Sequence, residues 1–185
     1  HRKNPSSRHK SSCFDVEYRS NNVGARDDVQ YDINGMRNSV LLLGDSFLEG
    51  FGLHLEQTFA KQLEHRIKRQ TLNFGAAGSV GPVQYYVLYE KRAKQFNHSD
   101  LVVLFLPSND FSDNDWQVWK VREVDRTRYR PYFRRLGDGK YDFVYPATAV
   151  KHPYFGAHYA QSSNWRAYLM AYTYFSNVYR TVEEV

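Results

Sequence analysis

The chain has 185 residues, of which 42% are hydrophobic and 24% are charged, a balance typical of a soluble globular domain with its own core. No apolar run approaches the roughly 18 residues that a membrane-spanning helix needs, which excludes a transmembrane segment within this sequence. The single cysteine, Cys13, excludes an internal disulfide and leaves the redox compartment open.

The net charge of +5 comes in part from two clusters of basic residues. Such clusters can attract nucleic acid or anionic lipid, but no nucleic-acid-binding motif accompanies them. We therefore interpret them as solvated basic surface and expect no nucleic-acid partner. The clusters are Arg2, Lys3, Arg8 and Lys10 near the N-terminus, and Arg122, Arg126, Arg128, Arg130, Arg134 and Arg135 further along.

The start of the chain divides into a polar segment and the beginning of a domain. Residues 1–12 are polar and basic, which predicts a disordered lead-in, and residues 13–185 read as one domain. Apolar and polar residues alternate from Phe14 to Arg19, which predicts an edge strand. A turn-rich connector over 21–38 then leads into the first buried strand.

Residues 40–43 are four apolar residues in a row, which is typical of a short strand buried on both faces of a parallel sheet. Gly44, Asp45 and Ser46 follow directly. Ligands in open α/β sheets bind beyond the carboxyl ends of the strands, so Ser46 lies where chemistry is usually done. Taken alone, however, the tripeptide is more often a simple turn than a site.

Helices and strands then alternate along the chain, which predicts parallel strand pairing. We expect the Gly-punctuated loop from Phe47 to Leu53 to form one wall of a pocket. In the next helix Phe59, Leu63 and Ile67 recur every four residues on one face, and His65 reads as a surface residue. The predicted elements are a helix over 57–69, a strand over 71–74, a helix over 82–95 and a strand over 101–106.

A β-hairpin is predicted after the third strand, because two alternating segments flank Gly137-Asp138-Gly139-Lys140. We interpret it as part of an insertion over about 118–160. Its Tyr and Arg content suits a sugar or an anionic substrate, and a packed lid is the alternative. The last predicted element is a helix over 164–184.

The ends of the three buried strands carry the sequence's most specific pattern. Gly44-Asp45-Ser46, the segment from Asn73 to Gly78, and Ser108-Asn109-Asp110 resemble, in order and spacing, the SGNH (GDSL-type) hydrolase family. The resemblance covers residues 38–116. A turn with an aromatic residue, Asn, Gly and Arg-Asp, here over 18–27, also precedes the Ser segment in many bacterial members. The resemblance implies a three-layer α/β/α sandwich with a parallel, flavodoxin-like sheet.

The resemblance also implies a serine ester hydrolase or acyl transferase that forms an acyl-enzyme on Ser46. The family's oxyanion hole maps onto the backbone N–H groups of Ser46 and Gly78 and the side-chain amide of Asn109. Gly75 is an alternative to Gly78, which fits the interval from Asn73 better.

Three neighbours of these residues, Asp45, Phe47 and Asp110, are expected to contact the substrate, an ester of a small molecule or a carbohydrate. We expect no metal or organic cofactor. Asp113 and Asp115 lack the Gly and the terminal Glu of a calcium loop, and the glycines over 75–81 match no nucleotide-binding pattern.

The family's base is not found, because no Asp-x-x-His occurs in this sequence. His54, His152 and His158 are the weak candidates for activating Ser46. Since no helix-stop signal precedes Val185, we expect that the sequence is a C-terminally incomplete copy of a longer protein. The alternative is a degenerate, catalytically inactive member of the family that binds a glycan or another ligand.

Overall fold

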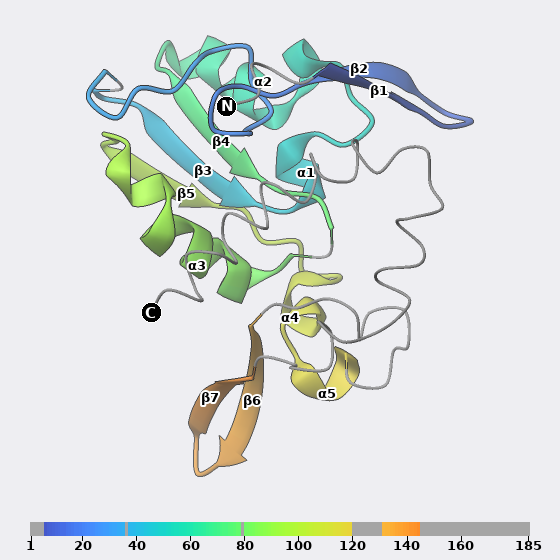
Figure 1. Ribbon diagram of the computed structural model, residues 1–185, viewed down its shortest axis with the longest axis vertical. Coiled ribbons are helices and arrows are strands. Elements are labelled where there is room, and N and C mark those ends of the chain that lie inside the picture. The colour runs from blue at the N-terminus through green and yellow to red at the C-terminus, as the bar shows by residue number, and fades with distance from the viewer. Residues whose placement is uncertain (1–5, 36, 79, 120–130, 145–185) are drawn as a thin grey trace.

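Figure 1 shows the structure, a computed structural model that describes residues 6–35, 37–78, 80–119 and 131–144. Its architecture is mixed α/β, built on a three-stranded parallel sheet with a two-stranded antiparallel hairpin at each end of the described chain. The predicted helix over 164–184 and the candidate bases His152 and His158 lie outside these ranges.

The sheet has the order β4-β3-β5, with β3 (Val40–Gly44) between β4 (Thr71–Gly75) and β5 (Asp100–Val103). Both pairings are parallel, as predicted. All five residues of β3 are buried, which is what a continuous apolar run in a central strand indicates. The third strand is shorter than predicted, because β5 ends at Val103 and not at Leu106.

The described helices are short, and most connect one strand to the next. They are α1 (Ser46–Glu49), η1 (Leu55–Gln57), α2 (Phe59–Ile67), α3 (Pro82–Lys91), η2 (Ala93–Gln95), α4 (Asp110–Asp113) and α5 (Trp116–Trp119), where η marks a 3-10 helix. None of the helices in the described ranges combines the length and hydropathy that a bilayer span requires.

Helices cover both faces of the sheet (Figure 1). Alternate residues of a strand point to opposite faces, and those of β3 divide accordingly between two core clusters. One cluster joins β3 and β4 to α3, and the other joins β3 to α1 and α2. The first includes Leu41, Leu43, Leu72, Phe74, Tyr85 and Leu88, and the second is Val40, Leu42, Leu48 and Ala60.

The helix predicted over 57–69 is replaced by η1 and α2. Thr58 lies between them, and its hydroxyl accepts the backbone N–H three residues later, so the α-helix begins after this N-cap. Only part of the apolar face that we expected for this helix is buried. Ala60 is buried against the sheet, whereas Phe59 is 42% exposed and Ile67 is 37% exposed.

The prediction of a disordered lead-in over 1–12 is wrong for residues 6–10, which form β1 (Ser6–Lys10). This strand pairs antiparallel with β2 (Asp15–Arg19), which is the edge strand expected from the alternating pattern. The Arg8 guanidinium donates to both Asp15 carboxylate oxygens, and the His9 ring stacks on Tyr18 with centroids 4.1 Å apart. These cross-strand contacts order a segment whose composition favours disorder.

The predicted hairpin is confirmed as β6 (Tyr132–Gly137) paired antiparallel with β7 (Lys140–Val144). Asp138 and Gly139 at its tip both have positive φ, as a tight hairpin turn requires. The hairpin projects away from the parallel sheet, beyond α4 and α5 (Figure 1).

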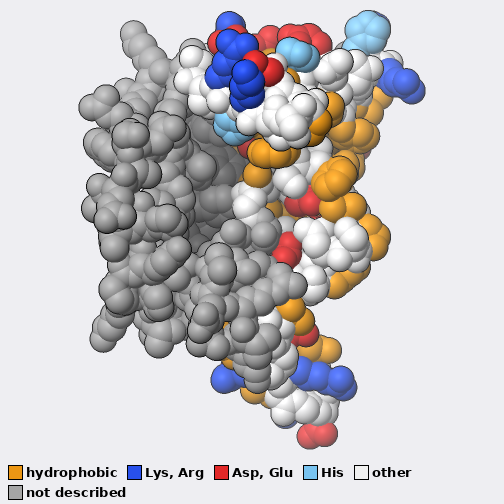
Figure 2. Space-filling view, turned by 90° about the vertical axis from the view of Figure 1, so that its right-hand side faces the viewer, with side chains coloured by type: hydrophobic (Ala, Val, Ile, Leu, Met, Phe, Trp, Pro, Cys, Tyr) orange, Lys and Arg blue, Asp and Glu red, His pale blue; other side chains and the backbone are white. Residues whose placement is uncertain are grey.

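Charged side chains are interspersed on the surface. On the face shown in Figure 2, basic side chains stand in separate groups, and the group at the top lies against acidic side chains. Several of the described arginines and lysines pair with carboxylates, among them Arg8 with Asp15, Arg69 with Asp100 and Arg134 with Asp142. Exposed pairs of this kind contribute little stability.

Candidate active site

The carboxyl ends of β3, β4 and β5 meet at one edge of the sheet, beside α1 (Figure 1). Backbone hydrogen bonds from Ala76 to Gly44 (3.1 Å) and from Leu104 to Leu43 (2.8 Å) extend the pairing one residue beyond β4 and β5. The three segments that carry the predicted catalytic residues therefore all leave the sheet at this edge.

Ser46 is the first residue of α1, and its side chain is half-buried. The turn before it is fixed by Asp45, the N-cap of α1, whose Oδ1 accepts the Phe47 N–H at 2.9 Å. Asp45 is only 4% exposed, so it shapes the turn from inside the protein. Phe47 is 70% exposed beside Ser46, which is compatible with the predicted substrate contact.

The two candidate oxyanion glycines have different environments. The Gly75 N–H donates to Asn73 Oδ1 at 2.9 Å, and a Cβ at Gly75 would lie 2.4 Å from the backbone nitrogen of Glu49. Gly75 therefore serves the close approach of α1 to β4. Gly78 is exposed in the following loop with φ 110°, a conformation that favours glycine. Its catalytic role stays a prediction.

Asn109 precedes α4, and its side-chain amide is oriented by a neighbour in that helix. The amide nitrogen Nδ2 donates to Asp113 Oδ2 at 2.9 Å, while Oδ1 is buried without a partner among the described residues. An amide nitrogen carries two hydrogens, so one donor is left for a ligand.

Asp110, which was also predicted to contact substrate, is completely buried. Its carboxylate accepts the Leu106 N–H at 2.9 Å and the Tyr85 hydroxyl at 3.1 Å. These bonds close the loop between β5 and α4 and connect it to α3. Asp110 therefore supports the loop in this structure, and a direct contact with substrate would require it to become exposed.

Electrostatic coupling indicates that the loops after β3 and β5 are close together. Burial raises the pKa of Asp110, and the charges of Asp45 and Asp113 raise it further. Burial likewise raises the pKa of Tyr85, and the charges of Asp110 and Asp45 act in the same direction. The acidic groups at the ends of the two strands thus disfavour the ionised form of Asp110.

The sequence analysis did not identify Arg26 as a residue that supports the site. Its guanidinium donates to the backbone carbonyl of Glu49 at 3.2 Å and to those of Gly50 and Leu53. It also lies 3.8 Å from the centroid of the Tyr18 ring. The Asn-Gly-Arg-Asp turn was the available signal, and the structure shows that its arginine holds the loop that follows Ser46.

A buried polar chain runs beside this contact. The Tyr31 hydroxyl donates to Asp27 Oδ2 at 2.7 Å and accepts the Asn73 N–H at 2.7 Å. The Asn73 side chain in turn donates to the Leu48 carbonyl at 3.3 Å. Hydrogen bonds therefore join the connector that holds Asp27 and Tyr31 to strand β4, and strand β4 to helix α1. The local sequence pattern does not reveal these bonds.

Within the described ranges, no histidine forms a hydrogen bond with Ser46. His65 is exposed on α2, as predicted, and His54 is exposed at the start of η1. His98 contacts the carbonyl of Phe96 at 2.7 Å and the hydroxyl of Tyr89 at 3.3 Å. The base that the family resemblance requires is not identified among these residues.

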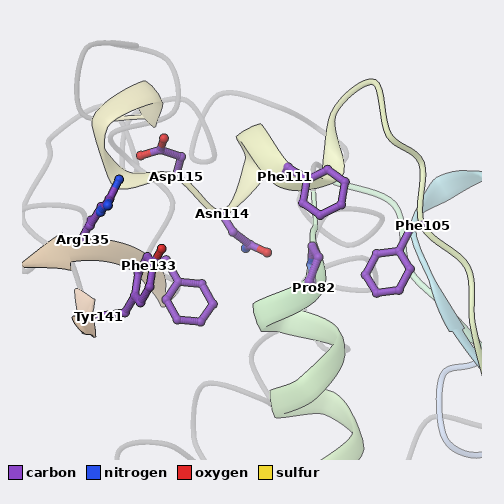
Figure 3. A pocket seen from close by; sticks show the side chains of 8 residues that line it. All are labelled: Pro82, Phe105, Phe111, Asn114, Asp115, Phe133, Arg135 and Tyr141. Carbon is purple, nitrogen blue, oxygen red and sulfur yellow. The ribbon is translucent and has the colours of Figure 1, made fainter. Parts of the chain in front are cut away.

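A cavity of about 540 Å³ lies between the β6–β7 hairpin, the α4–α5 connection and the start of α3 (Figure 3). Phe105 and Phe111 line it from the loop after β5 and from α4, and Phe133 and Tyr141 line it from the hairpin. Arg135 and Asp115 lie at the end away from Phe105. The lining residues are Pro82, Phe105, Phe111, Asn114, Asp115, Phe133, Arg135 and Tyr141.

The cavity adjoins the predicted catalytic segments without including their key residues. Phe111 follows Asn109 by two residues and Pro82 follows Gly78 by four, but neither Asn109 nor Gly78 is among the lining residues. The hairpin thus contributes to an aromatic hollow next to the candidate site. Both predicted roles for it, substrate binding and packing, stay open.

In the part of the chain that the structure describes, no group of three or more His, Cys, Asp or Glu side chains is arranged to hold a metal ion. The expectation that the protein needs no metal or organic cofactor stays a prediction.

Comparison with known proteins finds no matching family model, no matching curated protein and no matching solved structure. The resemblance to the SGNH hydrolases therefore stays a prediction from the motifs of this sequence.

Proposed function

We propose that this protein is a serine ester hydrolase or acyl transferase of the SGNH type, acting on an ester of a small molecule or a carbohydrate. The proposal includes the complete three-layer α/β/α, flavodoxin-like sandwich, of which the parallel sheet with helices on both faces would be a part. What supports it most is the meeting of the Ser46, Gly78 and Asn109 segments at one edge of the sheet.

In the proposed reaction, Ser46 Oγ attacks the carbonyl carbon of the ester while a base takes the hydroxyl proton. The alcohol leaves with a proton, and an acyl group remains on Ser46 until water or a second alcohol displaces it. The N–H groups of Ser46 and Gly78 and the Asn109 amide would stabilise the oxyanion. His54, His152 and His158 are the base candidates that this chain offers.

Hydrolysis of p-nitrophenyl acetate by the purified intact gene product tests the proposal, because no base for Ser46 is identified among the described residues. We expect hydrolysis by the unaltered protein, a loss to background in Ser46→Ala, and no loss in Ser12→Ala, which removes an exposed hydroxyl in the turn between β1 and β2. Equal rates in all three proteins would contradict the assignment of Ser46 as the nucleophile.

The aromatic cavity favours a second candidate function, a catalytically inactive module that binds a glycan. Sugar rings pack against aromatic side chains, and four such rings line the cavity. On a panel of neutral and acidic oligosaccharides, this function predicts binding that Tyr141→Ala weakens and Ser46→Ala leaves unchanged. Hydrolysis that depends on Ser46 would rule it out.

A further inference from the structure

The cavity of about 540 Å³ beside the candidate site is walled by two separate pairs of aromatic rings. Phe105 and Phe111 have ring planes 1° apart and centroids 6.2 Å apart. Phe133 and Tyr141, from the hairpin, meet edge to face with centroids 5.8 Å apart. Figure 3 shows the two pairs on different sides of the hollow. A cavity of this size and lining suits a small molecule with a flat apolar body.

The four rings are open to solvent, although large apolar side chains usually pack into the core of a domain. Their exposed fractions range from 40% for Phe133 to 66% for Phe111. Exposed apolar surface that gathers in one concave place marks a site of interaction. The rings are therefore accessible to a ligand that enters the cavity.

One polar side chain of the cavity wall is already bonded at both ends within the protein. Asn114 Oδ1 accepts the Val83 N–H at 2.8 Å, and its Nδ2 donates to Gln84 Oε1 at 2.6 Å. These two bonds hold the α4–α5 connection against the start of α3. Asn114 therefore serves the wall itself, which leaves Arg135 and Asp115 as the charged lining side chains that a ligand can reach.

Arg135 differs from the arginine beside it, because it has no ion pair among the described residues. Arg134 lies on the other face of β6, where its guanidinium pairs with Asp142 of β7. Alternate residues of a strand point to opposite faces, so Arg135 shares the cavity face with Phe133 and, across the hairpin, with Tyr141. A guanidinium matches a carboxylate in charge and in shape. Arg135 is thus available to bind an anionic group.

We propose that this cavity is a binding site for an aromatic carboxylate, with the aryl body between the two pairs of rings and the carboxylate at Arg135. The site goes beyond the proposed function, since its occupation requires no reaction at Ser46. Asp115 lies at the same end of the cavity and carries the opposite charge to Arg135 (Figure 3). It limits the affinity for an anion, so the two residues have opposite effects on binding.

Titration calorimetry of the purified protein with cinnamate and its neutral analogue cinnamamide tests the site directly. Cinnamate should bind about tenfold more tightly than cinnamamide, and Arg135→Gln should remove this preference, because it removes the charge-assisted hydrogen bond. Arg134→Gln is the matched control and should bind cinnamate like the unaltered protein. Asp115→Asn keeps an oxygen for the Gln117 N–H and should strengthen cinnamate binding about threefold.

The apolar part of the site is tested with Phe133→Leu, which keeps the bulk of the side chain but removes a ring. This variant should bind both compounds more weakly, and full affinity in it would overturn the role of the rings. Ser46→Ala should bind cinnamate like the unaltered protein, so a failure of the proposed function leaves this test intact.

Three other results would overturn the inference. The first is equal affinity for cinnamate and cinnamamide in the unaltered protein, and the second is unchanged cinnamate binding in Arg135→Gln. The third is binding of a neutral disaccharide such as cellobiose without binding of cinnamate, which would favour the glycan-binding function. In that case Asp115→Asn should weaken binding, since the carboxylate would accept a sugar hydroxyl.

Discussion

The buried carboxyl of Glu49 makes the stability of this protein depend on pH in a direction that can be stated in advance. Its folded-state pKa of about 7 lies above the ordinary value of 4.5, so the native state binds the proton more tightly than the unfolded chain. The stability that this group contributes is therefore fully present below pH 4.5 and lost as the pH rises through 7. Glu49→Gln removes this dependence, because the amide does not titrate.

The magnitude follows from the size of the shift. At about 1.4 kcal/mol per pKa unit, the shift corresponds to an upper limit of about 3.5 kcal/mol. Relaxation around the group and the entry of water reduce this value, so we expect about 1–3 kcal/mol. The free energy of unfolding of Glu49→Gln, relative to the unaltered protein, should rise by that amount between about pH 4 and about pH 8.

Urea unfolding of both proteins at the two pH values gives the required double difference. The other buried carboxyls, such as Asp27 and Asp110, titrate in both proteins and cancel. Glu56→Gln, at an exposed position in η1, serves as the control, and its double difference should be close to zero. A double difference of zero for Glu49→Gln, or one of opposite sign, would refute the reasoning that burial dominates the ionisation of this group.

Three further substitutions test the site and its supports. Asn109→Ala should lower kcat for an ester by about 10²–10³ with little change in KM, because one oxyanion donor is lost, and an unchanged kcat would remove Asn109 from the proposed site. Gly81→Ala should lower the free energy of unfolding by about 1–3 kcal/mol, since the new Cβ would lie 2.5 Å from the Asp110 carbonyl oxygen. An unchanged urea midpoint would show that the approach is not close. Arg26→Gln should cost about 2–4 kcal/mol, because it removes a buried guanidinium that donates to three carbonyls of the Ser46 loop. Thermal unfolding measures this loss, and a cost below about 0.5 kcal/mol would assign the loop's order to other contacts.

Parts of the fold with local signals were predictable from sequence. The apolar run over 40–43 indicated a central parallel strand, and the Asp138-Gly139 pair indicated a hairpin, since each depends on neighbouring residues alone. The strand β1 was missed because its residues are polar and its order comes from cross-strand contacts such as that between Arg8 and Asp15. Composition alone could not reveal those contacts.

The supports of the candidate site were harder to predict because they link residues far apart in the sequence. Arg26 acts on carbonyls 23 to 27 residues later, and Tyr31 contacts Asn73 across 42 residues. Glu49 belonged to the loop predicted as one wall of a pocket, whereas in the structure it ends α1 and one oxygen of its carboxyl group is buried. Only the packing of α1 on the sheet explains that difference.

The central claim is that groups from three strand ends converge on one ester carbonyl, with the Ser46 hydroxyl at its carbon and the Gly78 N–H and the Asn109 amide at its oxygen. A crystal structure of the protein after reaction with a fluorophosphonate tests this convergence most directly. The account predicts phosphorus bonded to Ser46 Oγ, with its oxygen about 3 Å from the Gly78 nitrogen and from Asn109 Nδ2. An adduct on another residue, or a phosphoryl oxygen directed away from both donors, would contradict it.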